Sequence, residues 1–521
     1  MISNYLPTDY QTFIATSRYA RWIEDKGRRE TWVETVQRYT DYLHSKGIDL
    51  TGQDWDDIEG AILELEVMPS MRALMTAGVA ADRDNTCIYN CSYVAVDHPR
   101  AFDEAMFILL CGTGVGFSVE RQSISQLPEI PNTLGQSEDV IAVQDSKEGW
   151  AKALRKLISL LYTGDIPKWD LDKIRPAGSR LKTFGGRASG PEPLNDLFNF
   201  VVAKFKGAMG RKLNSIECHD IMCKIGEVVV VGGVRRSAMI SLSNLSDTRM
   251  AHAKSGSWWE NEKQRALANN SACYTEKPDS ETFLREWLAL VESKSGERGI
   301  FSRVAAEAHV AKNGRRETGY AWGTNPCSEI ILRSNQFCNL TEVVVRETDD
   351  LASLKRKVRL ATILGTAQAT FTHMPYLRPI WTKNTSEERL LGVSLTGIMD
   401  HPVLGKNVDS PKWLAEMKQV AIDTNAEYAE RLGIEVSAAI TCVKPSGTVS
   451  QLVDSASGIH ARHSDHYIRT VRGDNKDPLT QFLKDAGIPA EADVMKPDAT
   501  TVFSFPTKSP MSAVTRNAMT A

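Results

Sequence analysis

One short segment, residues 325–329, brings together side chains of complementary chemistry. It reads Asn325-Pro326-Cys327-Ser328-Glu329. A thiol has a weak S–H bond suited to radical transfer, a carboxylate near neutral pH is a competent base, and an amide can donate a hydrogen bond. In an extended segment, residues two apart point to the same face, so we expect Asn325, Cys327 and Glu329 to project together. A buried structural cysteine beside a surface glutamate is the alternative that this segment alone leaves open.

A second segment, residues 444–450, has the composition of a phosphate-binding loop. It reads KPSGTVS, so small hydroxyl residues and a glycine precede an apolar stretch that can be helical. Backbone N–H groups at such a helix start, together with hydroxyl donors, form a natural phosphate cradle. The segment does not match G-x-x-x-x-G-K-[ST], which disfavours a P-loop ATPase, and a simple turn is the alternative.

A basic loop is predicted at residues 232–237, which read GGVRRS. Four valines at 228–231 precede it and AMISL at 238–242 follows, a pattern typical of strand, tight loop and strand. Two arginines at the tip suit an anionic ligand, although solvated charge is the commoner role of such a pair.

Two further motifs lack the spacing that their usual functions require. Residues 111–117 read CGTGVGF, and the third glycine comes one residue too early for G-x-G-x-x-G, so we reject a dinucleotide-binding fold. The cysteine pairs that could suggest zinc have no second half, so we expect no metal ligands from the protein. These pairs are Cys87 with Cys91 and Cys218 with Cys223.

Hydrophobic periodicity predicts the elements that position these segments. Residues 15–45 are expected to be helical, because apolar residues recur there at helical spacing behind a capping box. The stripe consists of Trp32, Val36, Tyr39 and Leu43, and the box of Thr31 and Glu34. From Cys87 onward, β-rich runs at 91–96 and 114–120 indicate a mixed α/β body.

Two more helices are predicted on either side of a glycine-rich loop. Asp145 and Ser146 can cap the first helix. The apolar stripe of the first is Trp150, Leu154, Leu157 and Leu161, and that of the second is Leu194, Leu197, Phe198, Val201 and Phe205.

Composition restricts the class of protein. The chain has 521 residues, 42% of them hydrophobic and 24% charged, which is ordinary for a globular protein and excludes a disordered chain. A balance of 62 basic against 65 acidic residues provides no broad positive surface for polymeric nucleic acid. Neither a signal peptide nor a membrane-spanning run is present, so we expect a cytoplasmic protein with no membrane partner. Nine cysteines are too few and scattered for a disulfide scaffold, so reduced thiols are the default.

Taken together, these segments resemble ribonucleotide reductases, most closely the monomeric, adenosylcobalamin-dependent ribonucleoside-triphosphate reductases. The matching segments occur in family order along nearly the whole chain. They are RRETWVETVQRY (28–39), NCSYVAV (90–96), FILLCGTGVGFSVERQ (107–122), RPAGSRLKTFGGRASGPEPL (175–194), GGVRRSAMISL (232–242), NPCSE (325–329), FCNL (337–340) and KPSGT (444–448).

The resemblance implies an α/β fold, a ten-stranded barrel of two five-stranded halves around a central finger loop. Residues 1–85 would form an N-terminal helical region and 86–521 the catalytic barrel, with an effector-binding helical insertion at 140–237. In such enzymes the Co–C bond of adenosylcobalamin breaks to give a deoxyadenosyl radical, which takes hydrogen from a cysteine on the finger loop. That cysteine corresponds to Cys327. The cofactor carries the radical chemistry, while the protein positions it and excludes water.

The same resemblance assigns the chemical roles. The Cys327 thiyl radical abstracts the ribose 3′ hydrogen, Glu329 removes the 3′-hydroxyl proton, and Asn325 assists by a hydrogen bond. The 2′-hydroxyl then leaves as water. Cys91 and Cys338 correspond to the pair that supplies a proton and two reducing equivalents and closes to a disulfide. The other cysteines are expected to be ordinary buried thiols: Cys87, Cys111, Cys218, Cys223, Cys273 and Cys442.

Nucleotide-binding residues follow from the resemblance as well. Substrate phosphates would lie on Ser446, Gly447, Thr448 and Val449. Ser70 would add a second hydroxyl contact, and a plain helix cap is its alternative.

The basic loop resembles the specificity loop that links a deoxynucleotide effector to the substrate base. Its residues are Gly233, Arg235, Arg236 and Ser237. The helices around Trp150 and Leu197 resemble a region that forms the effector site within one chain, which favours a monomer. The implied partners are a ribonucleoside triphosphate, a deoxynucleoside triphosphate effector and a thioredoxin-like reductant.

Members of this family continue beyond the point that matches Ala521, with the last barrel elements, further cobalamin contacts and a tail with two reducing cysteines. We therefore expect a truncated piece or half of a split enzyme whose remainder is a separate C-terminal chain. One alternative is a catalytic subunit that uses diphosphates or receives its radical from a second subunit. Another is an inactive nucleotide-binding fragment that needs a partner chain. A thiol–disulfide oxidoreductase is a remote reading, because Cys-x-x-Cys is missing.

Overall fold

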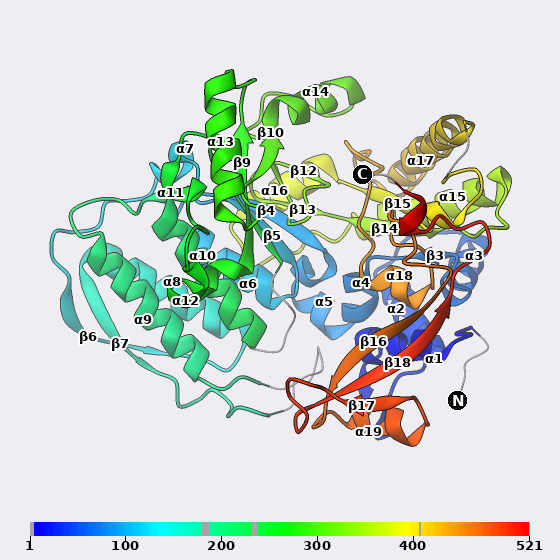
Figure 1. Cartoon of the computed structure of the whole chain (residues 1–521), viewed down its shortest axis with the longest axis horizontal. Coiled ribbons are helices and arrows are strands. Elements are labelled where there is room, and N and C mark those ends of the chain that lie inside the picture. Colours follow the sequence, from blue (N-terminus) through cyan, green and yellow to red (C-terminus); the bar gives the residue numbers. More distant parts are fainter. Residues whose placement is uncertain (1–4, 180–187, 232–237, 406–407, 520–521) are drawn as a thin grey trace. The chain divides into compact units, whose positions relative to one another are not determined.

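The computed structural model describes residues 5–179, 188–231, 238–405 and 408–519 (Figure 1). The chain folds into two compact units. The first consists of Met1–Val79, Leu340–Thr370 and Leu391–Ala521, and the second of Ala80–Asn339 and Phe371–Leu390. The predicted boundary at residue 85 and the predicted insertion at 140–237 stay predictions.

The second unit is built around a mainly parallel sheet. Among its described residues the strand order is β10-β9-β8-β5-β4-β13, and only the β13–β4 pair is antiparallel. The strands of the whole second unit are β4 (Cys91–Ala95), β5 (Gly114–Ser118), β6 (Gly135–Ala142), β7 (Asp165–Asp170), β8 (Met239–Asn244), β9 (Ala268–Tyr274), β10 (Gly299–Ser302), β11 (Gly323–Thr324), β12 (Ile331–Leu332) and β13 (Gln336–Cys338). Strands β6 and β7 form a separate pair, as do β11 and β12. Every residue of β5 is buried, as expected for a parallel strand covered on both faces.

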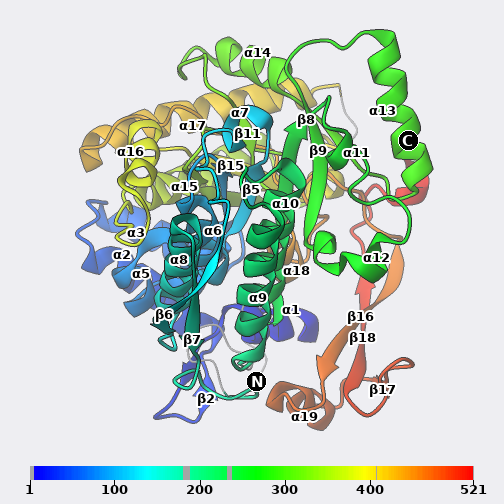
Figure 2. The same ribbon diagram turned by 90° about the vertical axis from the view of Figure 1, so that its left-hand side faces the viewer.

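Helices α8, α9 and α10 lie side by side in the second unit (Figure 2). The helices predicted around Trp150 and Leu197 are confirmed as α8 and α9, and Ser146 is the N-cap of α8. The helices of this unit are α5 (Val79–Arg83), α6 (Arg100–Leu110), α7 (Arg121–Ile124), α8 (Lys147–Thr163), α9 (Glu192–Gly207), α10 (Ser215–Val231), α11 (Thr248–Ala251), α12 (Trp258–Asn261), α13 (Ser280–Ser293), α14 (Arg303–Asn313) and α16 (Pro379–Glu388).

The strand predicted at residues 228–231 is wrong, because these valines form the last turn of α10. Cys218, Ile221, Met222 and Ile225 are fully buried at spacings of three, one and three, which is the pattern of a buried helix. A valine run favours a strand only where the neighbouring residues do not impose helical periodicity. The strand predicted at 238–242 is confirmed as β8.

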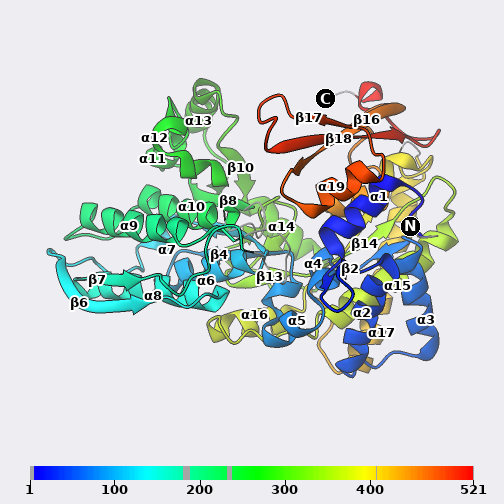
Figure 3. The ribbon, with the colours of Figure 1, turned by 90° about the horizontal axis from the view of Figure 1, so that it is seen from below.

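The first unit contains a small sheet of order β15-β14-β3 and a separate sheet of order β16-β18-β17. Helix α19 packs on β16 (Figure 3). The strands are β1 (Trp22–Ile23), β2 (Arg28–Arg29), β3 (Val67–Met68), β14 (Leu340–Val344), β15 (Gly392–Thr396), β16 (His466–Asp474), β17 (Ala490–Ala492) and β18 (Thr500–Lys508). The helices are α1 (Asp9–Ile14), α2 (Trp32–Ser45), α3 (Gly52–Leu63), α4 (Met71–Thr76), α15 (Leu351–Gln368), α17 (Ser410–Leu432), α18 (Thr448–Leu452) and α19 (Pro478–Asp485).

The predicted helix at 15–45 is confirmed only in its second half. Helix α2 begins after Thr31, whose side chain forms the predicted capping box with Glu34. Residues 15–19 form a single π-helical turn, and β1 and β2 pair as a hairpin before α2. The capping box therefore marks a true helix start rather than a point inside a longer helix.

Within the described ranges, none of the helices is long and apolar enough to cross a membrane. The α/β class predicted from the sequence is confirmed. The ten-stranded closure of a barrel stays a prediction.

Candidate active site

Cys327 lies at the tip of a hairpin formed by β11 and β12 in the second unit. The N–H of Ser328 donates to the carbonyl oxygen of Asn325 at 3.0 Å, and Ser328 has a φ of 64°. This is a tight turn, so the prediction that the segment is extended is wrong. The turn, rather than a pleated strand, determines where the three predicted side chains point.

The three side chains at this tip differ in exposure. Asn325 is fully buried, Cys327 is exposed and Glu329 is half-buried. The Asn325 Oδ1 accepts from the N–H of Ile330 at 3.0 Å. Its Nδ2 is buried and has no hydrogen-bond partner among the described residues. Because buried polar groups are nearly always bonded, this amide is suited to donate to a ligand.

Glycines in β5 allow the hairpin to lie directly on the sheet. A Cβ added to Gly116 would lie 1.8 Å from the carbonyl oxygen of Thr324, and one added to Gly114 would lie 2.9 Å from Cγ of Pro326. Only glycine permits such a close approach of backbone to backbone. The glycines that fail the dinucleotide pattern thus serve the contact between β5 and the loop of Cys327.

The predicted redox pair lies on the same face of this sheet. Cys91 pairs with Gly114 in the parallel ladder and with Cys338 in the antiparallel ladder. Directly paired residues project their side chains to the same face. Tyr93, two residues after Cys91, also projects to that face, where a Cβ on Gly323 would overlap its ring. The hairpin therefore covers the face that carries both cysteines.

The register of β4 and β13 suits a disulfide between Cys91 and Cys338. Directly opposed residues of an antiparallel pair have Cα atoms about 4.5–5.5 Å apart. A disulfide spans Cα atoms about 4.4–6.8 Å apart. The register therefore places the two Cα atoms within the range that a disulfide spans.

A buried ion pair anchors the first arm of the hairpin. The guanidinium of Arg303 binds both carboxylate oxygens of Glu120, at 2.7 and 3.0 Å, and its Nε donates to the carbonyl oxygen of Trp322 at 2.9 Å. Burial raises the pKa of Glu120, but the hydrogen bonds and charge of Arg303 outweigh it and lower that pKa overall. The pair joins the end of β5 to the residue that precedes β11.

A similar pair anchors the second arm. Arg316 forms a forked ion pair with Glu388, with both contacts at 2.8 Å, and donates to the carbonyl oxygen of Ile331 at 2.7 Å. Arg316 also donates to the Gln336 side chain at 3.1 Å. Both arms are therefore fixed while the tip remains accessible. No sequence pattern indicates either pair, because their members are distant along the chain.

The first anchor has a testable pH dependence. The depressed pKa of Glu120 means that its contribution to stability is complete above the unfolded value of about 4.3 and is lost as pH falls through the folded value. We expect Glu120→Gln to destabilise the protein by about 3–5 kcal/mol at pH 7, because it leaves Arg303 without its charge partner. Urea unfolding from pH 7 to pH 3 should show this difference shrinking below about pH 4.5.

Glu138→Gln is the matched control, because Glu138 pairs with Lys168 on the exposed surface of the same unit. Such surface pairs contribute little. A gap between wild type and Glu120→Gln that stays constant with pH would contradict the assignment of a charged Glu120.

The predicted phosphate loop lies in the first unit, immediately before α18. Ser446 is fully buried, and its hydroxyl has no hydrogen-bond partner within the described part of the chain. Hydroxyls of two other serines hold its carbonyl oxygen, Ser450 at 2.6 Å and Ser457 at 2.8 Å. The predicted helix start is confirmed, with Gly447 as the N-cap.

Ser70 lies next to the small sheet of β15, β14 and β3 in the first unit. It is the N-cap of α4 and follows β3, in which Met68 pairs with Glu342 of β14. Glu342 in turn binds the ammonium of Lys444 at 3.0 Å, two residues before Ser446. Both predicted phosphate contacts are thus connected to β14. The predicted specificity-loop residues Gly233, Arg235, Arg236 and Ser237 lie outside the described residues.

Five of the six remaining cysteines are buried as predicted: Cys87, Cys111, Cys218, Cys223 and Cys273. Cys442 is half-buried, so that prediction is wrong for it. Its backbone N–H donates to the carbonyl oxygen of Val393 in β15 at 3.1 Å, and its side chain does not enter the core.

Comparisons with known proteins agree on one family. Residues 129–203 match the family described as the insertion domain of B12-dependent ribonucleotide reductase. The adenosylcobalamin-dependent ribonucleoside-triphosphate reductase of Lacticaseibacillus paracasei is 29% identical over 94% of this chain and 77% of its own. The enzyme of the same name from Euglena gracilis is 28% identical over 94% of this chain and 69% of its own.

Solved structures share the fold. A crystal structure of a B12-dependent, class II ribonucleotide reductase has a TM-score of 0.80 at 24% identity and covers 96% of this chain and 82% of its own. The class Id ribonucleotide reductase alpha subunit of Actinobacillus ureae has a TM-score of 0.53 at 13% identity and covers 93% of this chain and 80% of its own. The fold is therefore that of the ribonucleotide reductases.

More narrowly, the chain is similar to the B12-dependent, class II ribonucleotide reductases. The resemblance read from its sequence motifs is thereby confirmed.

Proposed function

We propose that this chain reduces ribonucleoside triphosphates to 2′-deoxyribonucleoside triphosphates, with adenosylcobalamin as cofactor. The observation that carries the proposal is the hairpin tip with Cys327, which lies on the sheet face that carries Cys91 and Cys338. A hydrogen-abstracting thiol and a reducing dithiol are needed at the same ribose. The placement of all three cysteines in the second unit supports the proposal.

The exposure of Cys327 at this tip leaves it accessible to a cofactor. Adenosylcobalamin, when bound, supplies a carbon-centred radical that can take a hydrogen atom from a thiol. The exposed Cys327 is the residue that would meet it, because the neighbouring Asn325 and Pro326 are buried.

Each residue at the tip then has one task. Cys327 removes the ribose 3′ hydrogen and returns a hydrogen atom at the end of the cycle. Glu329 takes the 3′-hydroxyl proton, and the buried amide of Asn325 donates to the same substrate. The 2′-hydroxyl leaves as water, while Cys91 and Cys338 together supply two electrons and two protons and close to a disulfide. The balance is one nucleotide and one dithiol in, one deoxynucleotide, one disulfide and one water out.

Substrate phosphates are assigned to Ser446, Gly447, Thr448 and Val449, with a further contact from Ser70. The buried hydroxyl of Ser446 supports this assignment, because it has no acceptor among the described residues and a phosphate oxygen would provide one.

The remaining assignments extend the same proposal. Residues 232–237 would transmit effector identity to the substrate base, and a thioredoxin-like protein would reduce the disulfide. We place this reaction in the cytoplasm and assign it to a monomer.

Turnover tests the proposal directly. The chain is incubated with adenosylcobalamin, a dithiol and radiolabelled GTP, and deoxynucleotide is quantified with no second subunit present. GDP and ATP in parallel reactions test substrate class. Product formed only after addition of a metal-containing subunit, or only from GDP, would overturn the proposal in favour of the related reductase types.

The redox pair gives a separate prediction. We expect Cys91→Ser and Cys338→Ser each to lower turnover at least about 100-fold, because one thiol cannot close a disulfide. In wild type, one turnover without external reductant should consume two titratable thiols, measured after denaturation. Cys218→Ala is the control, since this thiol is buried in α10 away from the hairpin. Equal loss of thiols in wild type and either serine variant would contradict the pairing.

A further inference from the structure

Helix α4 begins at Ser70 and is held by contacts at both of its ends. The Ser70 side chain accepts from the N–H of Ala73 at 3.4 Å, as an N-cap does. A helix as short as Met71–Thr76 is not stable alone, so its position depends on tertiary contacts. The importance of these contacts rests on the proposed function, in which the Ser70 hydroxyl contacts a substrate phosphate.

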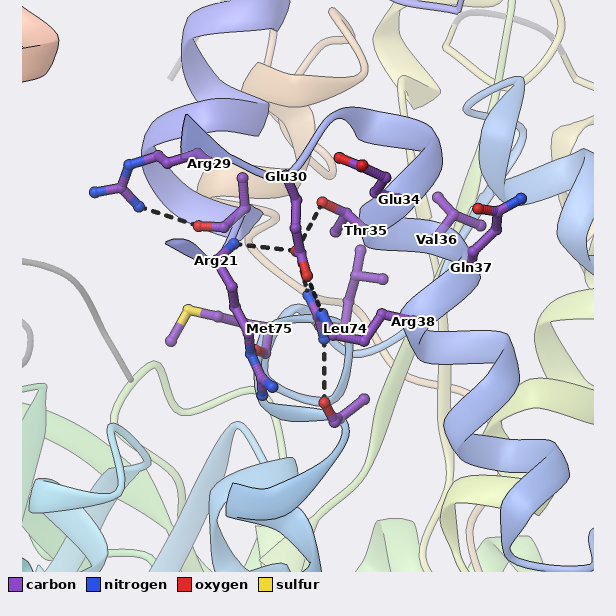
Figure 4. A network of polar contacts seen from close by, with 12 residues as sticks. Arg21, Arg29, Glu30, Glu34, Thr35, Val36, Gln37, Arg38, Leu74 and Met75 are labelled. Carbon is purple, nitrogen blue, oxygen red and sulfur yellow. Dashed lines mark hydrogen bonds and ion pairs between the residues drawn. The ribbon is translucent and has the colours of Figure 1, made fainter. Parts of the chain in front are cut away.

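Two arginines bind the last carbonyl groups of α4 (Figure 4). Arg38 Nη1 donates to the carbonyl oxygens of Leu74 at 2.9 Å and Ala77 at 3.2 Å. Arg21 Nε donates to the carbonyl oxygen of Met75 at 3.0 Å. The last carbonyl groups of a helix receive no hydrogen bond from its own N–H groups, so the arginines satisfy them. The positive charges also interact favourably with the negative end of the helix dipole.

Glu30 holds both arginines in place (Figure 4). Its carboxylate accepts from Nε and Nη2 of Arg38 at 2.7 and 3.0 Å, and from the backbone N–H of Arg21 at 3.0 Å. The hydroxyl of Thr35 adds a fourth contact at 3.2 Å. The side chains of Arg38 and Glu30 are only 17% and 8% exposed, so solvent screens this pair weakly.

The residue after Arg38 in α2 reaches the other end of α4. The hydroxyl of Tyr39 donates to Oε1 of Gln368 at 3.2 Å, and the N–H of Ser70 donates to the same oxygen at 3.1 Å. Tyr39 is fully buried. Helix α2 therefore supports α4 at its C-terminal end directly and at Ser70 through one shared acceptor.

We propose that Arg38 and Glu30 are positioning residues of the substrate phosphate site. They do not touch the nucleotide. They fix α4 along its axis and thereby fix the Ser70 hydroxyl relative to β14, next to which the phosphate loop is anchored through Glu342 and Lys444. The N-terminal helical region then contributes to substrate affinity through α4.

A double-mutant cycle tests this role. Arg38→Lys keeps a positive partner for Glu30 but loses the planar fork, so one ammonium must replace four hydrogen bonds. We expect Arg38→Lys and Ser70→Ala each to raise the Kd for GTP about tenfold, the loss of one charge-assisted hydrogen bond. Together they should raise Kd little more than either alone, because both remove the same phosphate contact. Equilibrium dialysis of radiolabelled GTP, with a deoxynucleoside triphosphate filling the effector site, provides the values.

Exchange of backbone amides provides a second readout. The peptide covering residues 69–78 should exchange faster in Arg38→Lys than in wild type. Glu34→Gln is the matched control on the same helix. It removes the charge of the exposed pairs with Lys26 and Arg28, keeps a side chain that can form the α2 capping box, and leaves the Arg38 contacts to α4. We expect wild-type Kd and wild-type exchange at 69–78 in this variant.

The outcomes separate the two proposals. Unchanged GTP affinity in Arg38→Lys, or fully additive effects with Ser70→Ala, would overturn the positioning role while the reductase proposal stands. Unchanged affinity in Ser70→Ala would show that Ser70 is only a helix cap, and the positioning role would fall with it. A wild-type chain that binds no GTP would overturn the proposed function itself.

Discussion

Cys327→Ser is expected to lower deoxynucleotide formation by at least roughly 10⁴-fold, with GTP affinity and thermal stability unchanged. A serine O–H bond is too strong to replace a thiol in hydrogen-atom transfer. The side chain is exposed at a turn, so the smaller hydroxyl changes no core packing. Radiolabelled deoxynucleotide, GTP dialysis and the thermal midpoint provide the three measurements.

The control for this variant is again Cys218→Ala, which removes a thiol from the same unit but not from the hairpin. Its turnover should remain within about twofold of wild type, since loss of one buried sulfur lowers the free energy of unfolding by only about 1 kcal/mol and leaves the hairpin residues unchanged. Residual turnover above about 1% in Cys327→Ser would contradict a thiyl mechanism at this residue.

Gly116→Ala is expected to disrupt the site by displacing the hairpin. The added Cβ would lie 1.8 Å from the carbonyl oxygen of Thr324 and 3.3 Å from Cγ2 of Ile240. Neither backbone can give way cheaply, because β5 is paired on both sides in the sheet. We expect a loss of at least about 3 kcal/mol in the free energy of unfolding and at least about 100-fold in turnover. Urea unfolding and the turnover assay measure the two effects.

Gly135→Ala is its matched control. Gly135 also lies in a strand of the second unit, and a Cβ there would meet nothing within 4 Å. Its stability and turnover should match those of wild type. If Gly116→Ala were as active and stable as Gly135→Ala, the hairpin could not lie on β5 as the structure has it.

Local sequence signals were sufficient for several elements. The capping box at Thr31 and Glu34 marked the start of α2, and Ser146 with the apolar stripe behind it marked α8. These signals are local because a cap and its helix lie within one or two turns of each other. The same holds for the start of α18 after Gly447.

Where strong local signals conflicted, neighbouring residues decided. The valines at 228–231 favour a strand by themselves, but Val228 and Val229 continue a buried helical stripe and the run joins α10. The segment after Asn325 likewise turns at Ser328 instead of extending. Propensity is a weak prior, and packing overrides it.

The residue types that the reaction needs were determined by the sequence, because an amide, a thiol and a carboxylate stand within five positions at 325–329. Only the tertiary structure decided that Cys91 faces Cys338 and that Gly114 and Gly116 admit the hairpin above them. Strand register joins residues more than 200 positions apart, and hydrophobic periodicity carries no information about such pairings. One short segment thus contains the residue types that the reaction needs, whereas the order and register of the strands determine which distant residues surround them.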